Sequence, residues 1–127
     1  MINIKTKRWK DEREAGDGFR LLICRFRPQW VRKRDETWDA WMPNLGPSRE
    51  LHADFYGKHG SPISWEEYRG RYLQEMEKQI EAIHRLAERA RAGETITLLC
   101  SSACTQEERC HRTLLKQLIE QAAEKSA

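Results

Sequence analysis

The sequence has no long apolar run, and this scarcity excludes a class of protein. None of its hydrophobic stretches approaches the roughly 20 residues that a helix needs to cross a bilayer. Its first ten residues, MINIKTKRWK, lack the apolar segment of a secretory signal. We therefore expect a cytoplasmic protein without a membrane partner.

Cysteine is also scarce, with 4 in the chain, and no C-x-x-C motif occurs. Because cytoplasmic thiols are kept reduced, these cysteines favour packing, catalysis, redox sensing or metal binding over a disulfide framework. The missing C-x-x-C argues against thioredoxin-like chemistry. Cys104 and Arg109 are one residue too close for the cysteine-to-arginine loop of a cysteine phosphatase.

An excess of one charge is missing too, since 23 basic and 20 acidic residues leave a net charge of +3. That charge is too small to indicate a nucleic-acid protein, but one basic cluster precedes the acid Asp35 and is interleaved with Phe26 and Trp30. The cluster suits a phosphate or carboxylate, so we expect a small anionic ligand, with nucleic acid as an alternative partner. It consists of Arg25, Arg27, Arg32, Lys33 and Arg34.

The length of 127 residues fits a single domain, residues 1–127, with its own hydrophobic core. Apolar patterns predict strands at INIKT (2–6), FRLLICRF (19–26) and TITLLC (95–100). A short helix is expected near 48–56. Apolar residues spaced three and four apart, Ile80 among them, predict a long helix with a buried stripe. Ser64 and Glu67 form a capping box at its start, and Gly93 ends it.

A strand, a long crossover helix and a second strand make a right-handed parallel unit. The chain then ends in a helix with a capping box of Thr105 and Glu108 and a buried stripe that includes Leu114 and Leu115. The predicted fold class is α/β, with a small, mostly parallel sheet, packed helices and a Rossmann-like three-layer tendency. Ligands are expected at the carboxyl ends of the strands, where 2–6 and 19–26 would be partners.

The segment LLCSSACTQEERCHRTLL (98–115) leaves one of these strand ends and enters the last helix. Free N–H groups and the positive end of the helix dipole at such a junction attract anions. If the helix begins near Gln106, a spacing of about 100° per residue turns His111 toward the sheet and leaves Cys110 and Arg112 on the margins of the buried stripe. Arg109 would point away.

Zinc is one interpretation of this segment, with Cys100, Cys104, Cys110 and His111 as its ligands. Adjacent residues diverge on a helix, however, so we expect no metal and no cofactor. A reactive thiol fits better, because a helix start and nearby arginines stabilise a thiolate. Cys104 and Cys110 are the two candidates, whereas core packing accounts equally well for Cys100 and better for Cys24.

Three other histidines have no partners in the sequence pattern, and we assign them structural roles. They are His52, His59 and His84.

The chain resembles the family known as domain of unknown function 488, and specifically its YeaO-like branch, over most of its length. The resemblance is carried by DGFRLLICRFRPQWVRKRDETWDAW, PSRELHADFYG, WEEYRGRYLQEM and TITLLCSSACTQEERCHRTLL. The CHR triplet at 110–112 is similar to a motif of the broader family. The resemblance implies a small cytoplasmic α/β protein of bacteria or archaea.

The resemblance also implies which residues form the site: Cys100, the triplet 110–112, and Arg25, Arg27 and Pro28 of RFRP as neighbours. The chain departs from the family after that proline, where it reads QWVRKR, and in the long spacing from Cys100 to Cys110. Cys104 is an extra cysteine, so the resemblance gives it no role.

The leading hypothesis is a protein that binds a small anionic ligand, such as a nucleotide or phosphorylated metabolite, at the strand-end rim. Arg25, Arg27, Ser101, Ser102 and Arg112 would bind this ligand. The motifs do not decide whether the protein is an enzyme.

If it is an enzyme, Cys110 would be the nucleophile or redox thiol, and His111 its base if the ring turns outward. Cys100 and Cys104 are its candidate thiol partners. The alternatives are a nucleic-acid-binding module that uses the stripe from Arg25 to Arg34, and a thiol redox accessory protein. The sequence gives no oligomeric state.

Overall fold

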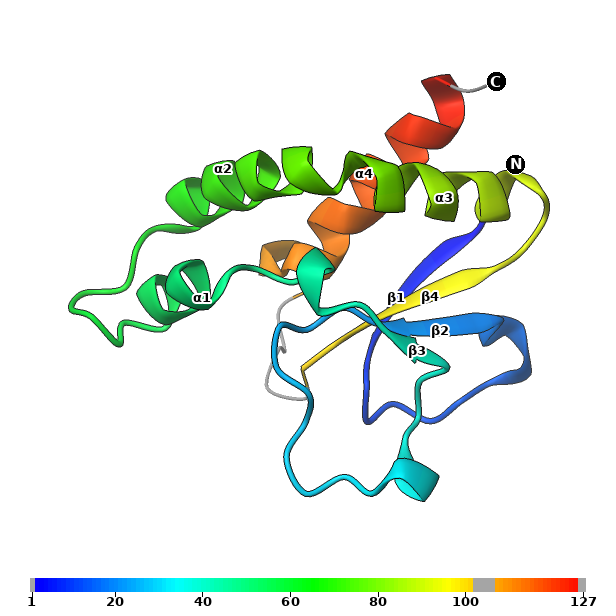
Figure 1. Cartoon of the computed structure of the whole chain (residues 1–127), viewed down its shortest axis with the longest axis horizontal. Helices are drawn as coiled ribbons and strands as arrows, with labels where there is room; N and C mark the ends of the chain where they lie inside the picture. The colour runs from blue at the N-terminus through cyan, green and yellow to red at the C-terminus, as the bar shows by residue number, and fades with distance from the viewer. Residues whose placement is uncertain (1, 102–106, 126–127) are drawn as a thin grey trace.

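The structure is a computed structural model that describes residues 2–101 and 107–125. The predicted residues Ser102, Cys104 and Thr105 lie outside these ranges. Within them the α/β class is confirmed: the strands form one parallel sheet, and the helices pack on it (Figure 1). The strands are β1 (Ile4–Arg8), β2 (Phe19–Leu22), β3 (Ala40–Trp41) and β4 (Ile96–Cys100). The helices are α1 (Arg49–Phe55), α2 (Trp65–Met76), α3 (Ile80–Arg91) and α4 (His111–Lys125).

Strand β4 occupies the middle of the sheet, whose order is β1-β4-β2-β3. It pairs with β1 through Ile4 and Ile96 and with β2 through Leu21 and Leu98. The sequence analysis expected residues 2–6 and 19–26 to be partners, and this expectation is wrong: the two strands lie on either side of β4. Every residue of β4 is buried, which suits a strand covered on both faces.

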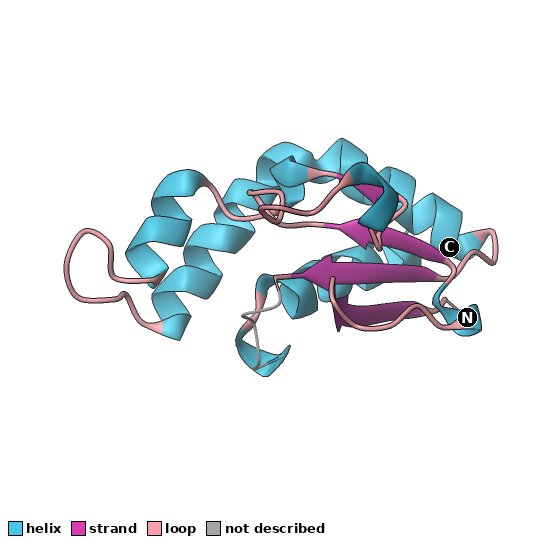
Figure 2. Ribbon diagram, turned by 90° about the horizontal axis from the view of Figure 1, so that it is seen from below, coloured by secondary structure: helices cyan, strands magenta, loops and turns pink. Residues whose placement is uncertain are grey.

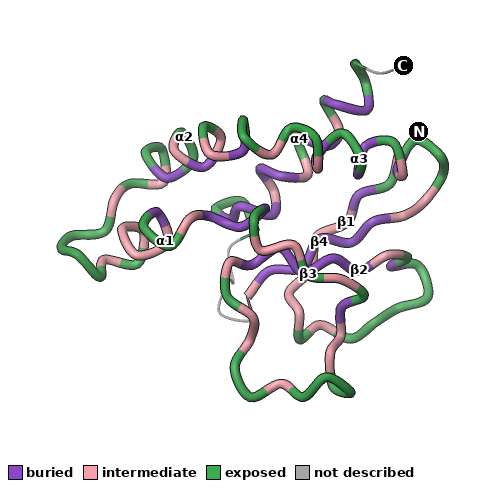
Figure 3. The backbone as a smooth tube through the Cα atoms, in the orientation of Figure 1, coloured by how far each residue is buried: buried purple, intermediate pink, exposed green. Residues whose placement is uncertain are grey.

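The two faces of the sheet are covered differently. Figure 1 shows α2, α3 and α4 on one face, where Leu21 and Leu98 join the helices in the larger hydrophobic core. On the other face Leu22 and Leu99 pack with Trp38 in a second cluster, which loop segments cover. Figure 3 shows the buried backbone running along the sheet between these layers.

The predicted long helix is present but divided. Ser64 caps α2, since its hydroxyl accepts a hydrogen bond from the Glu67 N–H at 3.1 Å, and Gly93 follows α3 with a φ of 103°. A 3₁₀ turn at Glu77–Gln79 separates α2 from α3. Ile80, the first residue of α3 after this turn, is 51% exposed rather than buried as predicted, whereas the predicted stripe positions Met76 and Ile83 on either side are buried.

Helix α4 begins later than the sequence indicated, at His111, after a 3₁₀ turn at Glu107–Arg109. Its predicted buried stripe is confirmed by Leu114 and Leu115. The later start changes which side chains reach the strand ends. Among the described residues, none of the helices is both long and apolar enough to traverse a bilayer.

A buried ion pair ties the loop before β2 to the sheet. The Arg20 Nη1 lies 2.6 Å from the Asp17 carboxylate, and both side chains are 0% exposed. Lys7 adds a contact of 2.9 Å from β1, while the Thr97 hydroxyl donates to the Asp17 carbonyl oxygen. Because β1, β2 and β4 all contact Asp17, this residue connects the three strands of the sheet away from their carboxyl ends.

Candidate functional site

A pocket of about 120 Å³ opens where β2 and β4 end and α4 begins. The arrowheads in Figure 2 all point toward this end of the sheet, the end that also carries α1. The pocket therefore lies at the carboxyl ends of the strands, where the sequence predicted a ligand site. The pocket is lined by Cys24, Arg25, Phe26, Pro47, His52, Phe55, Tyr56, Tyr68, Cys100, Ser101, Arg109, Cys110 and His111.

Two thiols and an imidazole meet at the floor of the pocket. The Cys110 Sγ lies 3.1 Å from the Cys100 Sγ and 3.9 Å from the His111 Nδ1. The other ring nitrogen of His111, Nε2, lies 2.9 Å from the Ile23 carbonyl oxygen. A carbonyl only accepts, so Nε2 carries a proton, and Nδ1 is the ring nitrogen that faces Cys110.

Cys110 and His111 converge because Cys110 precedes α4. Cys110 lies in a bend and His111 is the first helical residue. A helix that began near Gln106, as the sequence predicted, would include both residues, and their side chains would diverge. Since the helix begins one residue later than Cys110, the geometric objection to a shared site does not hold.

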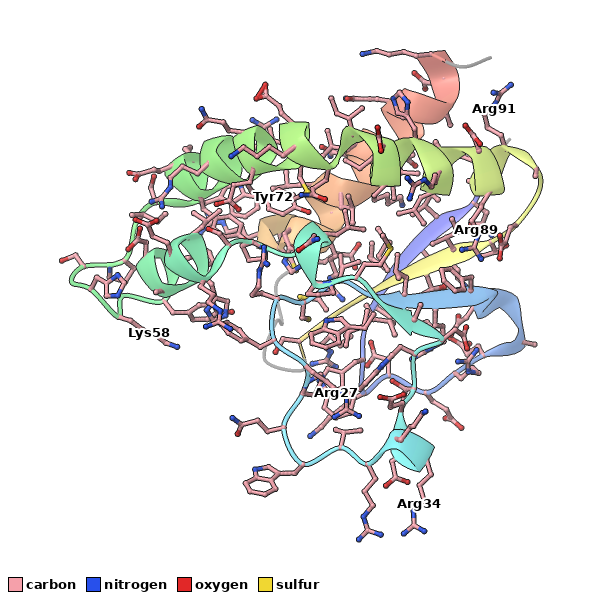
Figure 4. All side chains as sticks on the ribbon, viewed as in Figure 1. Arg27, Arg34, Lys58, Tyr72, Arg89 and Arg91 are labelled. Carbon is pink, nitrogen blue, oxygen red and sulfur yellow. The ribbon has the colours of Figure 1, made fainter. Side chains whose placement is uncertain are left out.

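Two tyrosines of α2 border the site. Tyr68 lines the pocket, and the Tyr72 ring lies 5.6 Å from the His111 ring while its hydroxyl donates to the Leu45 carbonyl oxygen at 2.7 Å (Figure 4). Burial raises the pKa of both phenols, and the nearby Cys110 raises it further. Both phenols are therefore protonated at neutral pH, and Tyr68 can donate a hydrogen bond to a ligand.

His52 belongs to the pocket, although the sequence analysis assigned it only a structural role. Its ring centroid lies 5.4 Å from that of Phe26 and 4.6 Å from that of Tyr56. Burial lowers the pKa of His52, and the charge of Lys58 lowers it further, so the ring is neutral at pH 7. The spacing of His52 and Tyr56, four residues apart on the predicted helix 48–56, is the signal that could have identified this wall.

The arginines divide between the pocket and other places. Arg25 lines the pocket, and its Nε donates to the Pro47 carbonyl oxygen at 3.0 Å. Arg27 does not line it: its guanidinium lies 2.7 Å from the Glu36 carboxylate and above the Trp38 ring, and Figure 4 shows it on the loop side of the sheet. The structure thus separates two arginines that the sequence grouped together.

Arg109 and Arg112 exchange the places expected for them. Arg109 lines the pocket because Glu107–Arg109 form a 3₁₀ turn rather than the first turn of an α-helix. Arg112 is 5% exposed and does not line the pocket; its Nε has no hydrogen-bond partner in the described part of the chain. Its charge reaches Asp11, whose pKa is lowered first by the Arg8 N–H and more weakly by Arg112.

Of the remaining predicted residues, Ser101 and Cys100 line the pocket. Cys24 also lines it, at the edge of the second hydrophobic cluster. The ligand atoms of Cys100, Cys110 and His111 lie within 4.8 Å of one another, close enough to hold a metal ion.

The sequence is similar to a family model and to uncharacterised bacterial proteins. Residues 4–123 match the family model described as the Active DUF488-N3 subclade. The chain is 35% identical to the uncharacterised protein YeaO of Escherichia coli (strain K12) over 104 residues, which are 82% of this chain and 87% of YeaO. It is 30% identical to the uncharacterised protein Rv3073c of Mycobacterium tuberculosis (strain ATCC 25618 / H37Rv) over 73 residues, 58% of this chain and 59% of that protein. No solved structure matches.

Proposed function

This chain belongs to the family of domain of unknown function 488, and from the chemistry of its pocket we propose that it is a thiol-dependent enzyme for a small anionic substrate. The match covers residues 4–123 and includes every described residue of the pocket. The description of the matched subclade as active is consistent with a catalytic role.

The position of His111 carries the proposal. The His111 Nε2–H donates a hydrogen bond to the Ile23 carbonyl oxygen, and this orientation turns Nδ1 toward the Cys110 Sγ, at 3.9 Å. From the sequence, we expected His111 to act as a base only if its ring turned outward. A buried ring that points Nδ1 at the thiol meets the same requirement.

In the proposed step the His111 Nδ1 removes the proton from the Cys110 Sγ. The thiolate then forms a bond to an electrophilic atom of the substrate, and the bond to the leaving group breaks. The imidazolium returns its proton to the leaving group. In the structure the Cys110 thiol donates toward the Cys100 Sγ at 3.1 Å. Once Cys110 has lost its proton, the Cys100 thiol can donate in the opposite direction and stabilise the thiolate before the attack.

Recognition of an anion is supported by the walls of the pocket. Arg25 and Arg109 bring two positive charges to the rim, and none of the described lining residues is acidic. The protonated phenol of Tyr68 and the start of α4 add hydrogen-bond donors. His52 adds no charge at neutral pH, so the two arginines determine the preference for an anion.

Alkylation by iodoacetamide tests the proposal, with metal removed by a chelator beforehand. We expect Cys110 to react at neutral pH faster in the wild-type protein than in His111→Gln, as measured by intact mass and peptide mapping. Inorganic phosphate or AMP should slow the reaction by occupying the pocket. His84→Gln, an exposed residue of α3, is the matched control and should react like the wild type. Equal rates in His111→Gln and wild type would overturn the base role of His111.

Nucleic-acid binding is a second candidate, favoured by one exposed indole. Trp30 is 96% exposed and has a φ of 67°, a backbone conformation that side chains of this size rarely adopt. The exposed cations that follow it suit a phosphate backbone, and the indole suits base stacking. These cations are Arg32, Lys33 and Arg34.

Fluorescence anisotropy with a labelled single-stranded oligonucleotide tests this candidate. Binding should weaken steeply as salt rises and should be reduced in Trp30→Ala and in Arg34→Ala. Arg91→Ala, at the far end of the molecule in Figure 4, is the control and should bind normally. Binding that ignores both salt and Trp30→Ala would contradict this second function.

A further inference from the structure

We infer that Cys100, Cys110 and His111 form a binding site for a soft divalent metal ion of the zinc class, with a fourth coordination position open to the pocket. Their ligand atoms lie within 4.8 Å of one another, and all three residues are buried. Two thiolates and an imidazole are ligands that zinc prefers over magnesium or calcium. The inference goes beyond the proposed function, which involves no metal ion. Metal binding can also be measured without turnover, so it is tested independently.

The distances between the ligand atoms fit a tetrahedral ion after small side-chain movements. With Zn–S near 2.3 Å and Zn–N near 2.05 Å, a tetrahedral site separates two sulfurs by about 3.8 Å and a sulfur from a nitrogen by about 3.5 Å. The two sulfurs here are 3.1 Å apart, and the Cys110 Sγ is 3.9 Å from the His111 Nδ1. Both separations lie within about 1 Å of the tetrahedral values.

His111 already has the environment of a metal ligand. A coordinating histidine almost always donates its second ring N–H to a carbonyl or carboxylate, which fixes the tautomer and orients the ring. The His111 Nε2 donates to the Ile23 carbonyl oxygen at 2.9 Å, and Nδ1 is the nitrogen that faces the Cys110 Sγ. The contact of 5.6 Å with the Tyr72 ring restricts ring rotation further.

The fourth position faces the pocket lined by Arg25, Arg109 and Tyr68. Three protein ligands with one open position are typical of zinc sites that bind water or substrate. Two thiolates neutralise the charge of a divalent ion, so the arginines remain available to an anion that coordinates the metal. A metal-bound Cys110 is withdrawn from nucleophilic attack, and zinc would therefore also protect it from alkylation.

Cobalt titration of reduced, chelator-treated protein tests the site. We expect one Co²⁺ per chain, a sulfur-to-cobalt charge-transfer absorption in the near ultraviolet, and displacement of Co²⁺ by Zn²⁺. Cys100→Ser, Cys110→Ser and His111→Gln should each weaken binding by at least about tenfold, since loss of an outer-shell contact alone costs that much. Cys24→Ser and His52→Gln remove pocket residues that lie outside the cluster and are the matched controls.

The outcomes separate this inference from the proposed function. A charge-transfer band in wild type and both controls that is lost in the three cluster variants, with unchanged circular dichroism, supports the site. Absence of the band, or a band that survives Cys100→Ser but disappears in Cys104→Ser, overturns this set of ligands. Alkylation in metal-free protein measures the role of His111 independently, so either proposal can fail without the other.

Discussion

The His111 Nε2 lies 2.9 Å from the carbonyl oxygen of Ile23, a residue 88 positions earlier in the chain. This contact joins the start of α4 to the segment that follows β2, and it determines which ring nitrogen of His111 carries a proton. In the proposed function, the backbone of that segment thereby orients the base that acts on the neighbouring Cys110. A substitution that displaces the Ile23 backbone should therefore change the alkylation rate of Cys110, even when the substituted residue contacts neither Cys110 nor His111.

Gly46→Ala is the substitution that tests this control. A Cβ at Gly46 would lie 2.6 Å from the Arg25 backbone nitrogen and 2.8 Å from the Ile23 carbonyl oxygen. Because backbone atoms cannot yield as a flexible side chain does, we expect a destabilisation of about 1–3 kcal/mol, measured by urea unfolding. The rate of Cys110 alkylation should also fall, because Ile23 positions His111.

Gly70→Ala is the matched control for this prediction. Gly70 lies within α2, and a Cβ there would meet nothing within 4 Å. Alanine should stabilise the helix by about 0.5–1 kcal/mol and leave the alkylation rate unchanged. If Gly46→Ala behaves like Gly70→Ala, the link between Ile23 and the site is wrong.

Tyr72→Phe should destabilise the protein. The substitution removes the donor to the Leu45 carbonyl oxygen, at 2.7 Å in a site with no solvent access. An acceptor left unsatisfied in the interior costs about 1–3 kcal/mol, and the midpoint of thermal unfolding should fall accordingly. An unchanged midpoint would show that the Leu45 carbonyl finds another partner.

Mild oxidation should join Cys100 to Cys110. Their sulfurs are 3.1 Å apart, so a movement of about 1 Å closes a disulfide bond. With hydrogen peroxide the two thiols lose their hydrogens, the S–S bond forms, and the peroxide is reduced to water. Peptide mapping should recover this pair in wild type and in Cys24→Ser. Predominant pairing through Cys24 or Cys104, or random pairing, would contradict a thiol redox function based on the Cys100 and Cys110 pair.

Asp17 should make stability depend on acid. Burial alone would raise its pKa, but hydrogen bonds from Lys7, the Glu14 N–H and Arg20 outweigh it and hold the pKa well below its usual range. The folded state therefore favours the carboxylate. Its contribution is complete above the ordinary aspartate pKa of about 3.9 and is lost as the pH falls below that value toward the folded pKa.

Urea unfolding of wild type and Asp17→Asn between neutral and acid pH measures this contribution. The variant should lose about 3–5 kcal/mol at neutral pH, because the Arg20 charge stays buried without its partner. The difference between the two proteins should shrink as the pH falls below about 4. Asp35→Asn, an exposed position, is the control and should follow the wild type. A difference that stays constant with pH would refute the assignment to Asp17.

Local signals in the sequence were enough for much of the fold. Ser64 and Gly93 marked the limits of the long helical segment, because capping and glycine stops act within a few residues. The apolar run 95–100 indicated a central strand, because a strand that is buried on both faces has apolar residues at successive positions instead of alternating apolar and polar ones. The strand end that leads into the last helix likewise located the pocket.

The sequence alone determined an α/β fold, its parallel crossover, and the position of a pocket near Cys100, Cys110 and His111. Tertiary structure decided what these residues can do. The later start of α4 turned Arg109 into the pocket and Arg112 away from it, and it let Cys110 and His111 converge. His52 joined them from α1, and Arg27 left to pair with Glu36. The reason is physical: periodicity depends on near neighbours in the chain, whereas a hydrogen bond between His111 and Ile23 depends on how distant segments pack.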